Sequence, residues 1–536
     1  MEKTGKKQGN AYRDGVRATD VTAVLYLICI FGVYPWITTN KYFNITITRY
    51  RFFIWASITF ILLMAFSNLL DRMILKYYGV NGTKLYDNDF FRADKLYKSP
   101  MVWIEAFALS NMCSFLFADD MNGAFTGNQG RFMGLGFFLC AIFVLFFLCA
   151  KLTEAIFVFF EISTLYAAIV AIYQHMEPVL KSRFWKIFPF AHYKDKVVKK
   201  HYNIFISTFG NINIYASFLA IAIPVLLCIV VYSKNCLHRR FATVVLAISS
   251  MTIMIANSDS AYLGIAAALL LLVIIAYRDD CLKRFWAGLV WIAFGYLCMT
   301  LLNFFVLKEY DRRGGLAEML DRPVLVAFIF MATILLYLIW SVAEKRFEQK
   351  LAAVNKNKVC LIFGIGLTVC VILVVIYGIC KKMSLFTFNY KWGTYRGYIW
   401  TKCKEIFCDA DFSHKLFGHG QESLRALMNE RYYDEMIQVT KKVYDNAHNE
   451  LLQYLITIGI TGLVSYLGMF ISSFVYIWKR AKKRVIPYVC LVAMTGYFAQ
   501  ALINVGQPIT TPFLFVFMAL GLGYVRNLRN EGDSDD

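Results

Sequence analysis

Apolar runs of about 20 residues recur along most of this chain, and they limit its fold more than any other feature. A run of that length, coiled as a helix, crosses the roughly 30 Å hydrocarbon core of a bilayer. Hydrophobic residues make up 59% of the 536 residues and charged residues only 17%, less than a soluble domain of this length carries. The sequence therefore predicts an all-α polytopic membrane protein.

The apolar runs predict about 14 transmembrane helices, eleven within 21–380 and three within 450–525. Between these groups, 381–449 is predicted to be one large extracytoplasmic loop, and loops of such length are usually functional. Residues 1–20 and the acidic end 526–536 are predicted to be cytoplasmic tails. The first run has no small-residue cleavage site, which favours an anchor over a removable signal. The predicted spans are 21–38, 52–70, 101–118, 133–150, 153–176, 209–232, 241–257, 260–277, 285–306, 324–343, 359–380, 450–478, 486–505 and 511–525.

The formal charge of +20 lies mostly in short segments between the apolar runs. That distribution is the orientation signal of a membrane protein, and it argues against a nucleic-acid partner. If the N-terminus is cytoplasmic, the basic loops all fall on the same side and the C-terminus joins them. These loops are 71–99, 233–240, 278–284, 344–358 and 479–485. The basic segment 177–208 falls on the outer side instead and needs another explanation.

Most of the 14 cysteines lie inside apolar runs, where a free thiol behaves as a small hydrophobe. The sequence has no CxxC pair, so neither a zinc site nor a redox centre is indicated. Cys403 and Cys408 share the outer loop, and a disulfide or two free thiols are both compatible with their positions.

Two stretches of the outer loop carry residues suited to phosphate or sugar chemistry. Arg396 lies among the aromatic residues of 390–400, and a guanidinium forms bidentate bonds to phosphate while flat rings stack on sugars. An interfacial aromatic belt with a snorkelling arginine is the alternative. Further on, Leu416-Phe417-Gly418-His419-Gly420 is compatible with an anion-binding nest or with an ordinary turn.

His448 marks the point where the outer loop meets the apolar run 450–478. Asp445, Asn446 or Asn449 could each cap the helix that follows. The positive end of the helix dipole disfavours imidazolium, which keeps the ring neutral as a general base requires. An interfacial histidine without a catalytic role is the alternative.

Four motifs in order make the chain resemble the O-antigen ligase and O-antigen polymerase superfamily, over roughly residues 205–525. The first two are Gly210-Asn211-Ile212-Asn213-Ile214-Tyr215-Ala216, similar to the family's GNxNxxA, and Ser258-Asp259-Ser260-Ala261-Tyr262-Leu263-Gly264, similar to its SRgxxlG. The third runs from Arg396 to Trp400 and continues at Leu416-Phe417-Gly418-His419-Gly420, similar to RxxxW and lfGxG. The fourth is Ala447-His448-Asn449-Glu450-Leu451-Leu452, similar to AHNxxL.

The resemblance implies a metal-independent, cofactor-free glycosyltransferase with the class C membrane fold, in the plasma membrane of a bacterium. Such an enzyme moves a glycan from undecaprenyl diphosphate to a hydroxyl of a glycan, lipid or cell-wall acceptor. It implies that His448 deprotonates or orients that hydroxyl and that Arg396 holds the leaving diphosphate. Implied substrate contacts are Trp400, Gly418, His419, Gly420, Asn449, Asp259 and Asn211.

Asp259 stands where the family often has arginine, which weakens the prediction of phosphate binding at that turn. We expect the basic segment from Lys181 to Lys200, including Lys199 and Lys200, to supply the missing positive charge.

A polysaccharide flippase or other transporter is the main alternative, and a membrane scaffold without enzymatic activity is the third. A transporter should show internal repeats and helices broken near the membrane midplane, and the sequence shows no clear repeat. The sequence does not distinguish a ligase from a polymerase.

Overall fold

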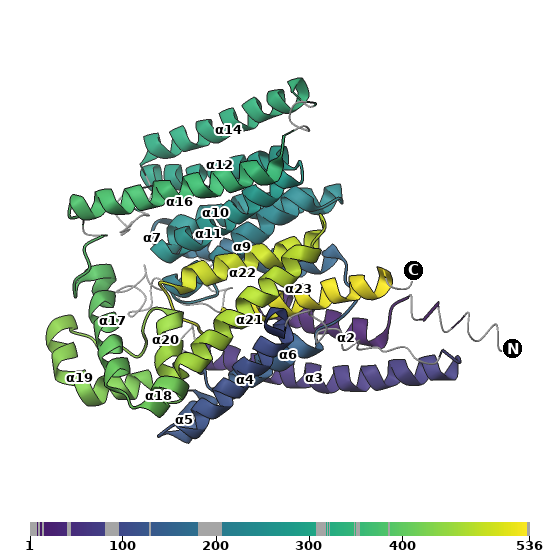
Figure 1. Ribbon diagram of the computed structural model, residues 1–536. Helices are drawn as coiled ribbons and strands as arrows, with labels where there is room; N and C mark the ends of the chain where they lie inside the picture. The colour runs from purple at the N-terminus through teal and green to yellow at the C-terminus, as the bar shows by residue number, and fades with distance from the viewer. Residues whose placement is uncertain are drawn as a thin grey trace.

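The computed structural model describes residues 15–39, 44–80, 96–127, 130–180, 206–306, 322–347, 354–383 and 386–532, with a few isolated positions between them. All secondary structure within these ranges is helical, as the resemblance and the apolar runs predict (Figure 1). The first half contains α2 (Ala18–Leu27), α3 (Ile45–Tyr77), α4 (Pro100–Leu116), α5 (Met121–Thr126), α6 (Leu135–Phe147), α7 (Phe157–Leu180), α9 (Ile212–Tyr232), α10 (Cys236–Ala256), α11 (Asp259–Arg278) and α12 (Leu282–Val306). The second half contains α14 (Pro323–Arg346), α16 (Lys356–Cys380), α17 (Trp392–Asp409), α18 (Phe412–Phe417), α19 (Leu424–Thr440), α20 (Glu450–Thr457), α21 (Gly459–Arg480), α22 (Val485–Ala501) and α23 (Thr511–Gly532).

Ten of the helical segments in the described ranges are long and apolar enough to cross a membrane. The first of these continues α2 through a π-helix and a 3-10 turn as far as Trp36. Three further apolar helices, α4, α6 and α22, are shorter, with 17, 13 and 17 residues. The structure thus describes a polytopic membrane bundle, while the number of 14 spans stays a prediction.

Helix α9 forms the centre of the bundle and is almost entirely buried. It packs against α10, α11 and α22, and small residues let these helices approach closely. A Cβ on Gly264 of α11 would lie 2.6 Å from the Ala220 Cβ, and one on Gly496 of α22 would lie 2.0 Å from the Ala220 carbonyl oxygen. The glycine of the second sequence motif is therefore a helix-packing residue.

Helices α14 and α16 lie at the edge of the bundle and expose apolar side chains along most of their length (Figure 1). Only Val326 of α14 and Gly378 of α16 are buried. Exposed apolar surface of this extent suits lipid rather than water.

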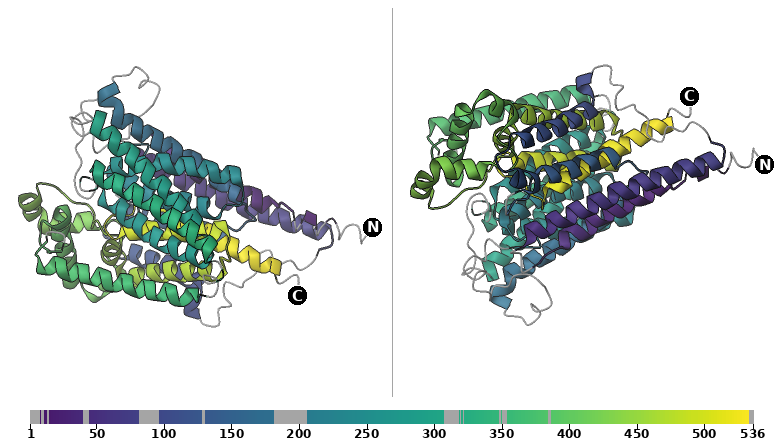
Figure 2. Two further views of the ribbon diagram at one scale, coloured as in Figure 1. Left: turned by 90° about the horizontal axis from the view of Figure 1, so that it is seen from above. Right: turned by 90° about the horizontal axis from the view of Figure 1, so that it is seen from below.

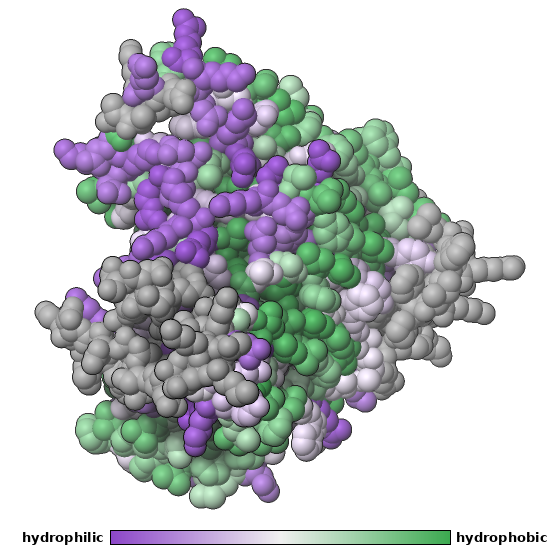
Figure 3. Space-filling view, turned by 90° about the vertical axis from the view of Figure 1, so that its right-hand side faces the viewer, coloured by the Kyte–Doolittle hydropathy of each residue, from purple (hydrophilic) through white to green (hydrophobic). Residues whose placement is uncertain are grey.

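The two ends of the bundle differ in what they carry. Both ends of the described chain lie at the end opposite to α17, α18 and α19 (Figures 1 and 2). Viewed from the side of the chain ends, hydrophilic side chains cover much of the surface and hydrophobic ones cover the flanks (Figure 3). Several predicted cytoplasmic loops meet here, since Lys356 pairs with Asp280 and the Lys483 ammonium donates to the Asp279 carbonyl oxygen.

The run 450–478, predicted as one continuous helix, is two helices in the structure. They separate at Ile458, and Gly459 has a left-handed φ of +70° that only glycine adopts without strain. The sequence-based prediction was wrong here because an apolar run does not reveal a break whose backbone groups find partners elsewhere in the fold.

The carbonyl groups freed by this break are satisfied by other segments. The His419 N–H donates to the Ile456 carbonyl oxygen at 3.1 Å, and the Ser114 hydroxyl donates to that of Thr457 at 2.6 Å. A helix can end inside a membrane protein only when its last carbonyls are bonded in this way.

The segment 381–449 folds into α17, α18 and α19 instead of forming an irregular loop. These helices have a small core of their own, which includes Tyr398, Ile406, Leu424 and Met436. Both cysteines of the segment are free thiols in the structure, because Cys403 and Cys408 lie five residues apart on α17.

Replacing Gly459 by alanine should destabilise the fold, because a Cβ there would lie 2.2 Å from the Leu416 carbonyl oxygen. With the left-handed backbone, we expect a loss of about 2 kcal/mol or more, measured as a lower thermal unfolding midpoint in detergent. Gly366→Ala in α16 is the control, since nothing surrounds that position and alanine favours helix. Equal losses in the two variants would contradict this interpretation.

Candidate active site

The turn that carries His448 is held by hydrogen bonds on every side. The Ala447 N–H donates to the Gln453 Oε1 at 3.0 Å, and the Trp400 indole N–H donates to the Ala447 carbonyl oxygen at 2.9 Å. The His448 N–H donates to the Asn446 side chain at 2.9 Å. The predicted contact Trp400 thus positions the turn from α17.

Asn449 caps α20, because its side-chain oxygen accepts from the Leu452 N–H at 3.0 Å. It is therefore the actual cap among the three residues considered from the sequence. His448 lies one residue before this cap, beside the first turn of α20 as predicted.

Both predicted catalytic residues lie at left-handed backbone: His448 is itself left-handed, and Arg396 directly follows three left-handed residues. His448 has a φ of +48°, and the three residues 393–395 before Arg396 all have φ between +57° and +69°. Left-handed backbone is costly for residues other than glycine, and persists only where surrounding contacts hold it. Such strain is concentrated at functional sites in proteins, which makes these two turns candidates for one.

The positive charge of Arg396 acts on His448 in the structure. Burial, together with the positive charges of Arg396 and Arg131, lowers the pKa of His448 to about 4. Burial also lowers the pKa of Arg396, and the neighbouring Asp259 carboxylate opposes this effect. The imidazole is therefore neutral at physiological pH, as predicted, although burial and two arginines rather than the helix dipole are the principal causes.

Each of these two side chains has a buried nitrogen without a hydrogen-bond partner among the described residues. They are Nδ1 of His448 and Nε of Arg396. Unsatisfied buried polar atoms are rare in native proteins and are common where a ligand or water completes the bonding. The Tyr444 ring meets the His448 ring edge-on, with 6.1 Å between centroids, and covers one side of the imidazole.

The first two sequence motifs reach the same end of the bundle. Asn211 caps α9 by accepting from the Asn213 N–H at 2.8 Å, and the Ser258 hydroxyl donates to the Asn213 side chain at 2.8 Å. Asp259 follows at the start of α11 and is exposed. Because Asp259 is a charged neighbour of Arg396, it acts on the arginine rather than serving as an anion-binding group itself.

The turn Gly418-His419-Gly420 packs chain segments together and offers no anion-binding nest. The Gly418 N–H donates to the His414 carbonyl oxygen and the His419 N–H to that of Ile456, so neither is available to a ligand. A Cβ on Gly418 would lie 2.4 Å from the Thr457 backbone. Burial lowers the pKa of His419 to about 4, but the charged groups around its ring are not those around His448.

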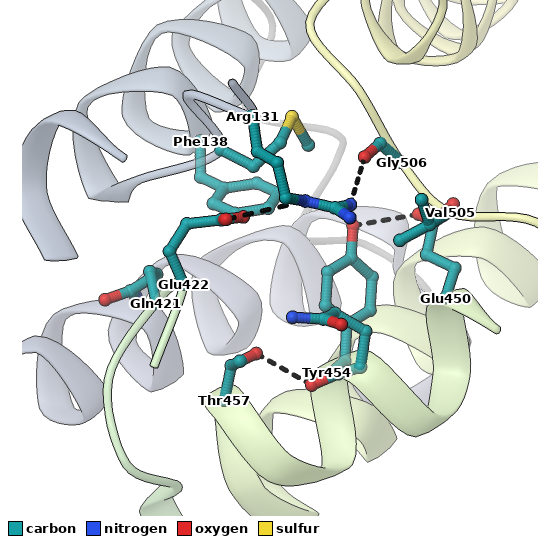
Figure 4. Close-up of a pocket in the computed structure, with 11 residues that line it drawn as sticks. Arg131, Phe138, Gln421, Glu422, Glu450, Tyr454, Thr457, Val505 and Gly506 are labelled. Carbon is teal, nitrogen blue, oxygen red and sulfur yellow. Dashed lines mark hydrogen bonds and ion pairs between the residues drawn. The ribbon is translucent and has the colours of Figure 1, made fainter. Parts of the chain in front are cut away.

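Arg131, which the sequence analysis did not single out, lies near the His448 turn, because its guanidinium faces the carboxylate of Asp445. Figure 4 shows it between Glu422 and Gly506. Its guanidinium is 3.5 Å from the Glu422 carboxylate and 3.9 Å from that of Asp445, and it donates to the Gly506 carbonyl oxygen at 2.9 Å. Its side chain is only 4% exposed. The sequence offered one indication of this residue, an arginine in a predicted outer loop between two apolar runs. Nothing in the sequence indicates which residues it pairs with.

Glu450 is the second residue that the sequence analysis did not assign to the site. Its carboxylate accepts from three tyrosine hydroxyls, those of Tyr454 at 2.8 Å, Tyr466 at 3.0 Å and Tyr497 at 2.9 Å. The three tyrosines belong to α20, α21 and α22, so this buried carboxylate ties the helix that follows His448 to two helices of the bundle.

Lys199 and Lys200, and the rest of the basic segment from Lys181, lie outside the described residues. Within the described ranges, no group of three or more His, Cys, Asp or Glu side chains could hold a metal ion.

Replacing Arg131 by glutamine should destabilise the fold, because it removes the guanidinium that faces the buried Glu422 carboxylate and loses that buried ion pair. Adding Glu422→Gln should recover part of that loss, measured by thermal or denaturant unfolding. Lys356→Gln removes an ion pair whose Asp280 partner is 68% exposed, and should cost less than about 1 kcal/mol. A double variant less stable than Arg131→Gln alone would contradict this account of the pair.

Comparison with known proteins supports the resemblance. Residues 322–467 match the family model described as O-antigen ligase. The matched segment runs from α14 into α21 and contains both Arg396 and His448. This segment is therefore similar to O-antigen ligases, a family of membrane enzymes that transfer glycans. No curated protein gives a significant match.

Proposed function

We propose that this membrane protein, whose residues 322–467 match the O-antigen ligase family, transfers a glycan from undecaprenyl diphosphate to an acceptor hydroxyl. The observation that carries the proposal is that the charge of Arg396 acts on His448, while each of the two side chains keeps a buried nitrogen without a partner among the described residues. They lie at the end of the bundle that carries α17, α18 and α19 (Figure 1).

In the proposed reaction, the acceptor hydroxyl gives its proton to Nδ1 of His448 as its oxygen bonds to the anomeric carbon of the donor glycan. The bond from that carbon to the diphosphate oxygen breaks, and its electron pair leaves with the lipid diphosphate. Arg396 stabilises the charge that grows on this leaving group, since a guanidinium binds phosphate oxygens in pairs. We propose that the transfer proceeds without a bound metal ion.

The low pKa of free His448 gives this mechanism a dependence on the donor. A base with a pKa of about 4 removes protons poorly at neutral pH. A bound diphosphate would offset the positive charge of Arg396, which contributes to the lowered pKa of His448. Donor binding would thus raise the basicity of His448 at the point where it is needed.

The negative charge of Asp259 in the second motif favours a role in positioning Arg396 over direct binding of the diphosphate. Where the family often has arginine, this chain has a carboxylate beside Arg396, which raises the pKa of that guanidinium against the effect of burial. We propose that Asp259 orients Arg396, and that Lys199 and Lys200 of the basic outer segment assist in binding the diphosphate.

The basic loops support an orientation with both termini in the cytoplasm of a bacterium and the site on the outer face of the plasma membrane. Undecaprenyl-linked donors are then presented from the same membrane. The comparisons lend no support to the flippase reading.

Replacing His448 by alanine should lower transfer about 10²–10⁴-fold, because the reaction loses its base. The measurement is the surface glycan of a deletion strain complemented with the variant. His414→Ala is the matched control, a histidine of the same outer segment that pairs with Asp411, and it should restore normal glycan. Normal glycan with His448→Ala would contradict the proposed mechanism.

The same deletion strain separates the two forms of the activity. Single repeat units without long chains indicate a polymerase, whereas full-length polymer retained on the lipid carrier indicates a ligase. Normal chains on their normal acceptor would favour neither and would argue for a scaffold or another function.

The pH dependence of transfer should differ between free and donor-bound enzyme. Since His448 must be neutral, kcat/KM should fall only as the pH drops through about 4. The bound diphosphate favours imidazolium, so kcat should fall at a higher pH than kcat/KM. Initial rates of purified protein from below pH 4 up to pH 8 test this, and limbs of kcat and kcat/KM that coincide would contradict the role of Arg396.

A further inference from the structure

A small pocket opens beside the His448 turn, between α6, α20 and the segments before α19 and α23 (Figure 4). Its polar lining comes from residues outside the chemistry proposed above, and Phe138 and Tyr454 supply aromatic rings. The polar residues are Arg131, Gln421, Glu422, Glu450, Gln453 and Thr457.

Two amide side chains of this pocket are held at one end and unsatisfied at the other. The Gln421 Nε2 donates to the Asn111 carbonyl oxygen at 2.8 Å, and the Gln453 Oε1 accepts from the Ala447 N–H at 3.0 Å. The opposite atoms, Oε1 of Gln421 and Nε2 of Gln453, are buried without a partner among the described residues. The two residues are only 3% and 5% exposed, so bulk water does not satisfy these atoms.

The orphaned atoms define the chemistry of a ligand. One is an acceptor and the other a donor, and a buried polar atom that stays unpaired destabilises the fold. A hydroxyl group both donates and accepts, so hydroxyl groups satisfy the pair. A diphosphate would meet the Arg131 guanidinium in this lining, but it would also meet an acceptor at Gln421 and the carboxylates of Glu422 and Glu450, which already oppose that cation and disfavour a second anion.

The position of the pocket indicates which hydroxyl-bearing group it takes. Arg396 and Arg131 both act on His448, but from different elements, α17 and the turn before α6. In a direct displacement the attacking oxygen enters opposite the leaving group. If the diphosphate lies at Arg396, the acceptor must reach His448 from elsewhere, and the Arg131 pocket adjoins the same turn through the Asp445 carboxylate.

We propose that this pocket binds the hydroxyl-bearing edge of an acceptor sugar, with Gln421 and Gln453 as its recognition residues. The inference rests on the proposed function and adds that the acceptor is a carbohydrate. The pocket is small and accommodates hydroxyl groups at the edge of a pyranose rather than a whole ring. Phe138 and Tyr454 offer apolar contact to the adjoining carbons.

Gln453→Glu tests the proposal with little change in shape. The variant keeps an oxygen to accept from the Ala447 N–H but replaces the unsatisfied donor by an acceptor. In purified full-length protein in lipid nanodiscs, we expect the KM for acceptor to rise about tenfold or more, equivalent to one lost hydrogen bond. The KM for donor should stay within about twofold. Gln421→Met, which removes the unsatisfied acceptor, should act in the same direction.

Controls separate recognition from folding. Gln438→Glu makes the same change on the exposed face of α19 and should leave both KM values unchanged. Thermal stabilisation by undecaprenyl diphosphate should persist in Gln453→Glu, which shows an intact donor site, and should be lost in Arg396→Ala. The acceptor is the molecule that the deletion strain identifies, a lipid-linked repeat unit for a polymerase or the anchor of the glycan for a ligase.

The outcomes distinguish this inference from the proposed function. Unchanged acceptor KM in both pocket variants, with transfer still dependent on His448, means that the pocket holds only water, and overturns the inference alone. An acceptor that contains no sugar also overturns it. Equal rises in both KM values mean a structural role and overturn it as well. Transfer that does not depend on His448 overturns the proposed function itself.

Discussion

The buried guanidinium of Arg131 is the contact on which the geometry of the site depends. It joins the turn before α6 to Glu422, Asp445 and Gly506, all of which lie far from Arg131 in the chain. A buried cation between carboxylates costs desolvation, and it persists only where the partners are well placed. In this fold it holds the outer helical segment onto the membrane bundle at the point where His448 lies.

Around that contact, backbone strain and helix breaks place the reactive groups. The left-handed residues 393–395 set the start of the regular part of α17, where Arg396 lies, and His448 itself is left-handed before α20. The break at Gly459 lets α20 end separately from α21. The turn before α20 is joined to α17 by the Trp400–Ala447 hydrogen bond, and the short α20 packs against α6 through the rings of Tyr454 and Phe138. The site is thus supported by rigid elements from both sides.

Much of this could be predicted from local sequence. The length of an apolar run predicts a membrane span, because a helix must be long enough to cross the hydrocarbon core. Asn449 could be predicted as a helix cap, because capping involves only a side chain and the backbone N–H groups of the next few residues. Motif order predicted that His448 and Arg396 act together, and in the structure the positive charge of Arg396 acts on His448. The helices within 381–449 were not predicted, because their apolar residues form a small separate core and not one long apolar run. Arg131 was missed because its partners are about 290 to 375 positions away in sequence.

By itself the sequence determined that this chain crosses a membrane many times as helices, and that its histidine and arginine motifs flank one outer segment. Those features depend on hydrophobic length and on residue order, which the chain carries locally. Only the tertiary structure decided which polar atoms remain unsatisfied beside His448, and whether the arginine turn reaches it. Such facts depend on how buried hydrogen bonds are shared among distant segments, and no local pattern encodes that distribution.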